Sequence, residues 1–184
     1  MKNIKKIFAV IVTTLAFQLA NSQTVIPIDS IPVSFKTSLN TMMDGYLKIE
    51  NALMTGNTTD AGKYADELRV TTLAVSTAGL SKKQIAIFNK QVRKIVHNTE
   101  HIRDNASDYD HECEHFDLVT DSFYKLLKAF HFNSTAIYYN YTAEGNAGNS
   151  AHWLTDKSTM ENPYFKGAKK SIGDKQIEVF AARS

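Results

Sequence analysis

Residues 81–130 read SKKQIAIFNKQVRKIVHNTEHIRDNASDYDHECEHFDLVTDSFYKLLKAF, and this stretch decides the fold. Apolar residues recur in it at intervals of three or four, a spacing that lines one face of an α-helix. The first run carries this stripe at Ile85, Phe88, Val92, Ile95, Thr99 and Ile102, and the second at Tyr109, Cys113, Phe116, Thr120, Phe123, Leu127 and Phe130. Ser81 and Gln84 have the spacing of a capping box, and Asp108 stands where an N-cap is expected. The pattern predicts two amphipathic helices joined by a tight turn at residues 104–107.

Two further stripes lie on the N-terminal side of this helical hairpin. They comprise Phe35, Leu39, Met42, Tyr46, Ile49 and Leu53, and then Ala61, Tyr64, Ala65, Leu68, Thr72 and Val75. Four amphipathic helices with short connections bury their stripes most simply as an antiparallel bundle. We therefore predict a single all-α domain over residues 34–184, an antiparallel four-helix bundle with an irregular C-terminal cap over about 131–184.

The cap segment, residues 131–184, differs from the helical part in its pattern of residues. Ile137-Tyr138-Tyr139 is strand-like, and residues 145–150 have the composition of a loop. Short apolar anchors follow, separated by polar residues. We expect Trp153, Tyr164 and Phe165 to pack against the bundle and hold an irregular segment in place.

Residues 1–22 have the organisation of a secretory signal peptide. Three lysines precede a predominantly apolar run of 14 residues from Ile7 to Ala20, and small residues flank the expected cleavage point. A membrane anchor is the alternative, but a spanning helix needs about 20 apolar residues. We expect cleavage near Ser22, an extended lead-in over residues 23–33, and a periplasmic or secreted chain with no membrane anchor after cleavage.

Composition narrows the classes of function. The 184 residues, 43% hydrophobic and 22% charged, suit one globular domain. Three of the 21 basic residues lie in the leader, which leaves 18 against 19 acidic residues and a net charge of −1. Such a chain has no basic excess for a nucleic-acid-binding face, so no nucleic-acid partner is expected. A single cysteine, Cys113, excludes an internal disulfide and a cysteine-rich zinc site.

Two groups of motifs resemble a known family. Residues 151–155 (AHWLT) and 162–165 (NPYF) are similar to its GAxWLS and NPYFG hallmarks. His101-Ile102, residues 108–116 (DYDHECEHF) and residues 124–130 (YKLLKAF) are similar to its upstream HI, DIEHQREHF and LVKAF block. The family is the bacterial exported domain of unknown function 3347, common in Bacteroidetes, and the likeness extends over about residues 35–180.

The resemblance implies a small helical domain, found alone or attached to the periplasmic adaptor subunits of heavy-metal efflux systems. It implies no catalytic activity, and it suggests binding of copper or a similar ion, with a periplasmic metal-efflux component as partner. This chain departs from the family at its Cys-Pro-Met and Met-x-x-Cys-Gly motifs, where Thr142, Glu144 and Ile172 stand in place of the two cysteines and the first methionine. Thiolate and thioether groups are the ligands that soft Cu(I) prefers, and these three residues cannot supply them.

Four histidines, His97, His101, His111 and His115, are the candidates for a metal site. Each helix carries two of them four residues apart, so each pair shares one helical face with β-carbons about 6 Å apart. In an antiparallel hairpin we expect His101 and His111 at one level and His97 and His115 about one turn further along. Imidazole suits Zn(II), Cu(II) and Ni(II).

Glutamates close to these histidines could take part in such a site. Glu100, Glu112 and Glu114 could add oxygen ligands, or accept hydrogen bonds from the histidine ligands. The His111–His115 stretch has the spacing and the first glutamate of a zinc-protease helix, but no further ligand signature follows, so we do not expect an enzyme. Cys113 lies on the apolar stripe, where a free cysteine packs as a small hydrophobic residue.

Two functions stay open at this point. One is an exported binding domain for a divalent transition metal (Cu, Zn or Ni), linked to metal efflux or resistance. The other is a structural or protein-interaction domain that binds no metal, because all four histidines lie off the apolar stripes and could simply be solvated.

Overall fold

The computed structural model describes residues 31–146, 148–166 and 174–183. The expected signal peptide, most of the expected lead-in, and Ile172 lie outside the described residues. In the part of the chain that the structure describes, no helix is both long and apolar enough to cross a membrane.

Four long helices account for most of the described chain: α1 (Val33–Met54), α2 (Thr58–Leu73), α3 (Lys82–Asp104) and α4 (Tyr109–Phe130). Their caps agree with the sequence: the Ser81 side chain accepts a hydrogen bond from the amide of Gln84, and the Gln84 side chain accepts one from the amide of Ser81. The Asp108 carboxylate accepts from the backbone amide of His111 at the start of α4. The four predicted helices are thus confirmed.

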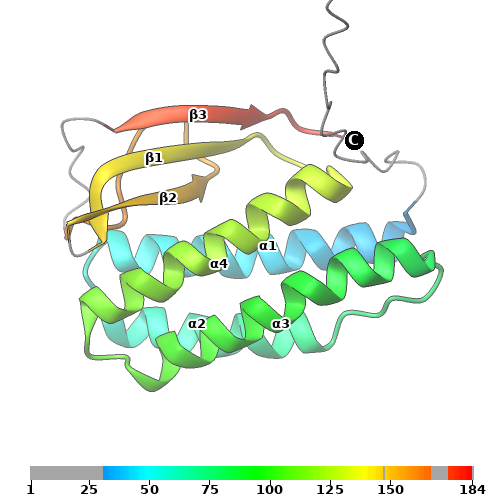
Figure 1. The fold of residues 1–184 in the computed structure, drawn as a ribbon, viewed down its shortest axis with the longest axis horizontal. Helices are drawn as coiled ribbons and strands as arrows, with labels where there is room; N and C mark the ends of the chain where they lie inside the picture. Colours follow the sequence, from blue (N-terminus) through cyan, green and yellow to red (C-terminus); the bar gives the residue numbers. More distant parts are fainter. Residues whose placement is uncertain (1–30, 147, 167–173, 184) are drawn as a thin grey trace, which may run out of the picture.

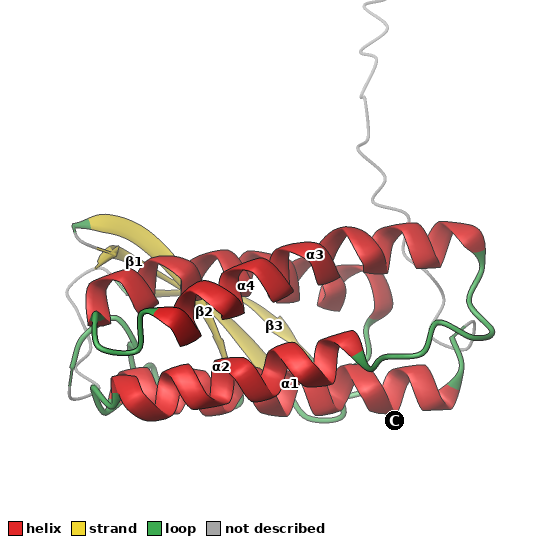
Figure 2. Cartoon of the chain, turned by 90° about the horizontal axis from the view of Figure 1, so that it is seen from below, coloured by secondary structure: helices red, strands yellow, loops and turns green. Residues whose placement is uncertain are grey.

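Each helix packs along the next one in the chain, as Figures 1 and 2 show. The predicted stripes face inward, and nearly all of their residues are buried. Across the core, the ring of Tyr46 on α1 stacks on Phe116 of α4 with 4.9 Å between ring centroids. Phe35, also on α1, meets Phe130 edge-on at 5.3 Å.

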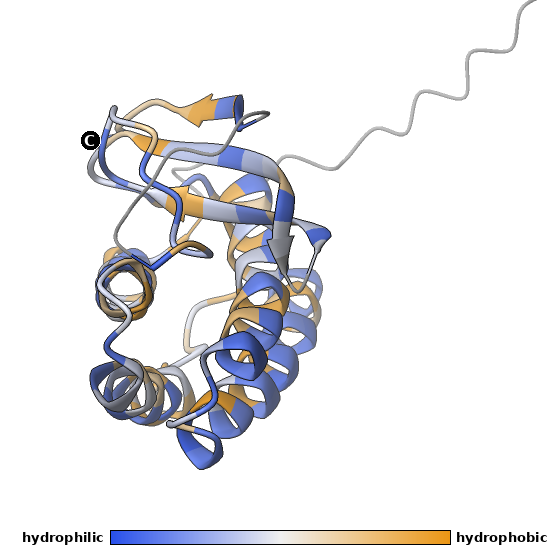
Figure 3. Ribbon diagram, turned by 90° about the vertical axis from the view of Figure 1, so that its left-hand side faces the viewer, coloured by the Kyte–Doolittle hydropathy of each residue, from blue (hydrophilic) through white to orange (hydrophobic). Residues whose placement is uncertain are grey.

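The C-terminal segment forms a three-stranded antiparallel sheet, so the predicted all-α class and the irregular cap are wrong. Its strands are β1 (Ile137–Asn146), β2 (Asn149–Thr155) and β3 (Lys175–Phe180), in the order β2-β1-β3. The sheet lies across α4 and α1, above the helices in Figure 1 and at the top of Figure 3.

The sheet was not predicted because its outer strands lack the usual alternation of buried and exposed residues. In β2 the consecutive residues Trp153, Leu154 and Thr155 are all buried, so both faces of this strand are covered and the usual alternation is lost. In the edge strand β3 only Phe180 is buried.

Packing of the sheet on the helices uses the expected aromatic residues. Trp153 is completely buried, and its ring meets Tyr164 edge-on at 6.4 Å between centroids. Tyr164 in turn lies 6.1 Å from Phe116 of α4, and Phe165 is half-buried. The backbone amide of Leu154 donates a hydrogen bond of 3.0 Å to the hydroxyl of Tyr46. These contacts hold the sheet against the helices, as predicted for Trp153 and Tyr164.

Candidate metal centre

The turn between α3 and α4 brings the candidate histidines together. Asn105 ends α3, Asp108 caps α4, and the amide of Asp108 donates to the carbonyl of Asn105 at 2.9 Å. This tight connection sets the last two turns of α3 beside the first two turns of α4. The side chain of His101 on α3 therefore faces those of His111 and His115 on α4.

Three of the four histidines form a compact group. One nitrogen from each of His101, His111 and His115 lies within 4.8 Å of the other two, and we call these residues the histidine triad. Nitrogens that share one tetrahedral Zn(II) ion at bonds of 2.0–2.1 Å lie about 3.3 Å apart, so closure by about 1.5 Å would complete a shared site. Side-chain rotation alone can supply a movement of this size, because all three residues are only half-buried.

The arrangement differs from the predicted one, in which His101 and His111 lie at one level and His97 and His115 at the next. The ring of His101 stacks on His115 with centroids 4.3 Å apart, whereas it lies 6.0 Å from His111. His101 is therefore closest to His115, and the two pairs do not lie level in the expected way. His97 is exposed and contacts His101 alone in the cluster, at 4.6 Å between ring centroids, and it is not part of the triad.

Asn98 orients one ligand of the triad, and sequence reasoning missed it. Its Oδ1 lies 2.8 Å from Nδ1 of His115, while its Nδ2 donates to the carbonyl of Lys94 at 2.7 Å. Because Nδ2 is held by that carbonyl, the atom facing His115 is an acceptor, and Nδ1 of His115 must carry the proton. The lone pair of His115 then lies on Nε2, where a metal could bind it. The only feature of the sequence that could have identified Asn98 is its position three residues before His101, close to the candidate histidines.

The surroundings of His115 favour neutral imidazole. Burial, followed by the neighbouring His101, His111 and His97, lowers the pKa of His115 to about 4. A neutral ring keeps a lone pair for a metal at neutral pH. Nε2 of His111 is buried with no hydrogen-bond partner, while its Nδ1 lies 4.0 Å from the carboxylate of Glu114. A metal ion in the triad would satisfy that unpaired nitrogen.

The carboxylates take a smaller part than expected. Among the described residues no aspartate or glutamate oxygen joins the triad within ligand distance. Glu112 is completely buried, and burial together with the charge of Asp108 raises its pKa to about 8. The carboxylate of Glu114 lies 4.0 Å from Nδ1 of His111, which is too far for a hydrogen bond. Among the described residues, the triad therefore offers three nitrogen donors and no oxygen donor.

Cys113 lies in the core, as expected for a cysteine on the apolar stripe. Its side chain is 2% exposed, and burial raises the pKa of its thiol to about 12. A thiol that holds its proton so tightly is a poor nucleophile and a poor metal ligand. This residue therefore packs as a small hydrophobic side chain.

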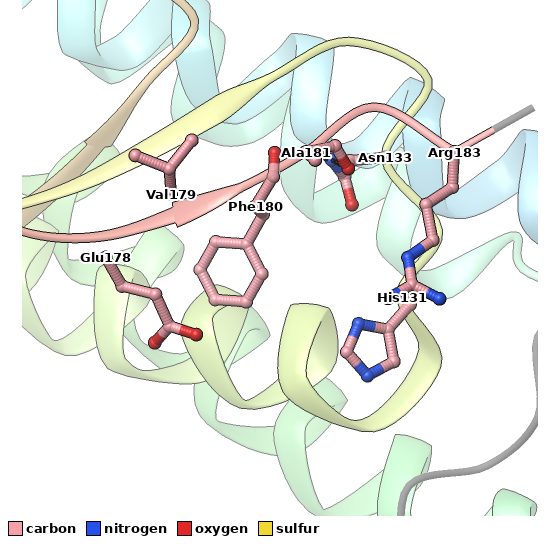
Figure 4. A pocket seen from close by; sticks show the side chains of 7 residues that line it. All are labelled: His131, Asn133, Glu178, Val179, Phe180, Ala181 and Arg183. Atoms are coloured by element: carbon pink, nitrogen blue, oxygen red, sulfur yellow. Dashed lines mark hydrogen bonds between the residues drawn. The ribbon is translucent and has the colours of Figure 1, made fainter.

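A recess of about 210 Å³ lies at the opposite end of α4 (Figure 4). It is lined by His131, Asn133, Glu178, Val179, Phe180, Ala181 and Arg183. His131 ends α4 in the left-handed conformation (φ 45°), and Nζ of Lys128 donates to the carboxylate of Glu178 at 2.8 Å. Lys128 also complements the negative end of the helix dipole. The amide of Asn133 bridges the carbonyls of Phe180 and Ala181, so the polar groups of this recess join β3 to the helix end.

The histidine triad lies within a recognisable family segment. A family model described as "Protein of unknown function (DUF3347)" matches residues 42–135, more than half of the 184 residues. The matched segment contains all four candidate histidines and Asn98. Neither a search of curated proteins nor one of solved structures returned a match to this chain. The chain therefore belongs to the DUF3347 family of proteins of unknown function.

Proposed function

We propose that this protein is an exported, non-enzymatic binding domain that holds one divalent transition-metal ion on His101, His111 and His115. The observation that carries the proposal is the triad itself, with three imidazole nitrogens within 4.8 Å of one another at the junction of two helices. We infer that the supporting scaffold is an antiparallel four-helix bundle, since short turns connect its four helices.

Two features support a metal rather than a chance cluster. One is the convergence itself, because one nitrogen from each of three rings on two different helices lies within 4.8 Å of the other two. In addition, Asn98 holds His115 in the tautomer whose free nitrogen can bind a metal, and Nε2 of His111 has no other partner. Histidine ligands held in this way by a hydrogen bond behind the metal are typical of metal sites in proteins.

The donor set indicates the class of ion. Three imidazole nitrogens suit Zn(II), Cu(II) and Ni(II), whereas Ca(II) and Mg(II) require oxygen ligands. Soft Cu(I) is less favoured, because the only cysteine is buried in the core and keeps its proton. Binding rather than catalysis is the activity we propose, since the Glu112 carboxylate is buried outside the triad and cannot activate a metal-bound water there.

Isothermal titration of the purified protein with Zn(II), Cu(II) and Ni(II) tests the proposal. We expect micromolar or tighter binding of at least one ion, and its loss in the double variant His101→Ala/His111→Ala. His131→Asn is the matched control, because it removes a histidine outside the triad and asparagine tolerates the left-handed conformation at that position. Heats no larger than those of buffer would instead favour the second hypothesis, a structural or protein-interaction domain that binds no metal.

Export and a link to metal efflux complete the proposal. The leader-like residues 1–22 support export to the periplasm or the medium after cleavage near Ser22. Resemblance to domains attached to efflux adaptors supports a periplasmic metal-efflux component as partner. Cell fractionation of a tagged chain would test the first point, and co-purification with a periplasmic metal-efflux adaptor would test the second.

A further inference from the structure

His97 extends the histidine triad outward into solvent. The four rings form a continuous chain, with centroids separated by 4.6 Å from His97 to His101, 4.3 Å from His101 to His115 and 4.6 Å from His115 to His111. Exposure changes along the chain, because His97 is exposed and the three triad residues are half-buried. An ion that approaches from solvent can thus bind His97, the most exposed of the four rings.

The position of His97 suits transient rather than resting coordination. It lies one helical turn from His101 and offers no nitrogen within the 4.8 Å limit that defines the triad. Its ring contacts the edge of His101, with an angle of 70° between the ring planes. An ion held by His97 and His101 together would reach the triad once His115 replaces His97 and His111 binds as well.

We propose that His97 is an exchange ligand, which captures the hydrated ion and passes it through His101 to the triad. This inference rests on the proposed function, because it assumes that the triad is the resting site. Each imidazole that binds first replaces one water of the ion's hydration shell. On transfer to the triad His101 stays bound, His115 replaces His97, and His111 replaces a further water. Release follows the same steps in reverse.

The proposal makes a kinetic prediction that separates it from a fourth permanent ligand. A residue that binds the ion only during exchange lowers the barrier equally in both directions, so it leaves the dissociation constant unchanged. A permanent ligand, by contrast, contributes to affinity, and its loss speeds dissociation. Since a side chain fixed close to a site acts at an effective concentration of millimolar or higher, we expect its removal to slow exchange by about tenfold.

The experiment compares wild-type protein with His97→Ala, using Zn(II) as the probe. Association is followed by stopped flow, dissociation by transfer of Zn(II) to an excess of a chromophoric chelator, and the dissociation constant by competition at equilibrium. Lys90→Ala is the matched control, because Lys90 is an exposed residue two helical turns away on the same face of α3. Free imidazole at millimolar concentration should restore the transfer rate of His97→Ala, but not that of a variant lacking His101.

The expected result is that both rates fall by about tenfold in His97→Ala while the dissociation constant stays within about twofold of wild type. Unchanged rates would overturn the exchange role and leave the triad intact as the binding site. A weaker dissociation constant with faster release would also overturn it, because His97 would then be a permanent ligand. Failure of wild-type protein to bind Zn(II), Cu(II) or Ni(II) would instead refute the proposed function itself.

Discussion

Replacement of Asn98 by leucine removes the hydrogen bond that orients His115 without altering any proposed ligand. The Oδ1–Nδ1 distance of 2.8 Å is that of a good hydrogen bond, and Asn98 is 5% exposed, so water cannot readily take its place. Loss of such a partner behind a metal ligand typically lowers affinity 10- to 100-fold, which corresponds to about 1.4–2.8 kcal/mol of binding free energy. We therefore expect Asn98→Leu to weaken Zn(II) binding by that factor.

The assay is competition for Zn(II) against a chelator of known affinity at pH 7.5, with circular dichroism to verify that each variant is folded. Asn51→Leu is the control, because Asn51 on α1 makes the same local bond to the carbonyl four residues earlier, at 2.8 Å, but accepts from Lys157 instead of a histidine. Asn98→Asp keeps an oxygen acceptor and should retain most of the affinity. Equal affinities for Asn98→Leu and wild type would refute the argument that this hydrogen bond prepares His115 for a metal.

The remaining predictions concern stability. Burial, as the largest cause, raises the pKa of Glu50 to about 8 from its ordinary 4.5, so the folded chain keeps a proton that the unfolded chain has lost between those values, and stability falls as pH rises through this window. Glu50→Gln should therefore stabilise the protein by up to about 5 kcal/mol at pH 9 and little at pH 4, as measured by urea unfolding. Glu144→Gln, at an exposed glutamate, is the control. A gain in stability that does not depend on pH, or an equal gain in the control, would contradict this prediction. Phe116→Ala, at a completely buried ring, should lower the free energy of unfolding by about 3–5 kcal/mol, and a loss below about 1 kcal/mol would contradict its packing role. Trp153→Ala should loosen the sheet and increase limited proteolysis after Phe130 while far-ultraviolet circular dichroism retains the helical signal. Unchanged protease resistance would contradict the role of Trp153 in holding the sheet against the helices.

The helices could be predicted because their determinants are local. Periodic apolar residues, the capping box at Ser81 and the N-cap at Asp108 act within four residues of one another, and the structure contains each of these features. The sheet depends on contacts between distant residues. Ile137 pairs with Phe180, and Asn140 with Trp153, so no local pattern contains the information on pairing.

The candidate metal site was likewise only partly predictable from the sequence. Spacing of four residues on either side of a tight turn was enough to name the four histidines and to place them on facing sides of two helices. It could not decide which of them converge, because the offset and rotation of α3 against α4 depend on how the whole core packs. A shift of one residue along a helix moves a side chain by about 1.5 Å and turns it by about 100°, which is enough to move a ring into or out of a shared site.

The sequence by itself thus determined the four helices, the caps at Ser81 and Asp108, and the set of candidate histidines, since each depends on hydrogen bonds and spacings within a few residues. Only the tertiary structure decided that the C-terminal segment is a sheet, that His101, His111 and His115 converge while His97 stays outside, and that Asn98 orients His115. These outcomes depend on the relative placement of elements, and that placement is set by the packing of the buried core as a whole.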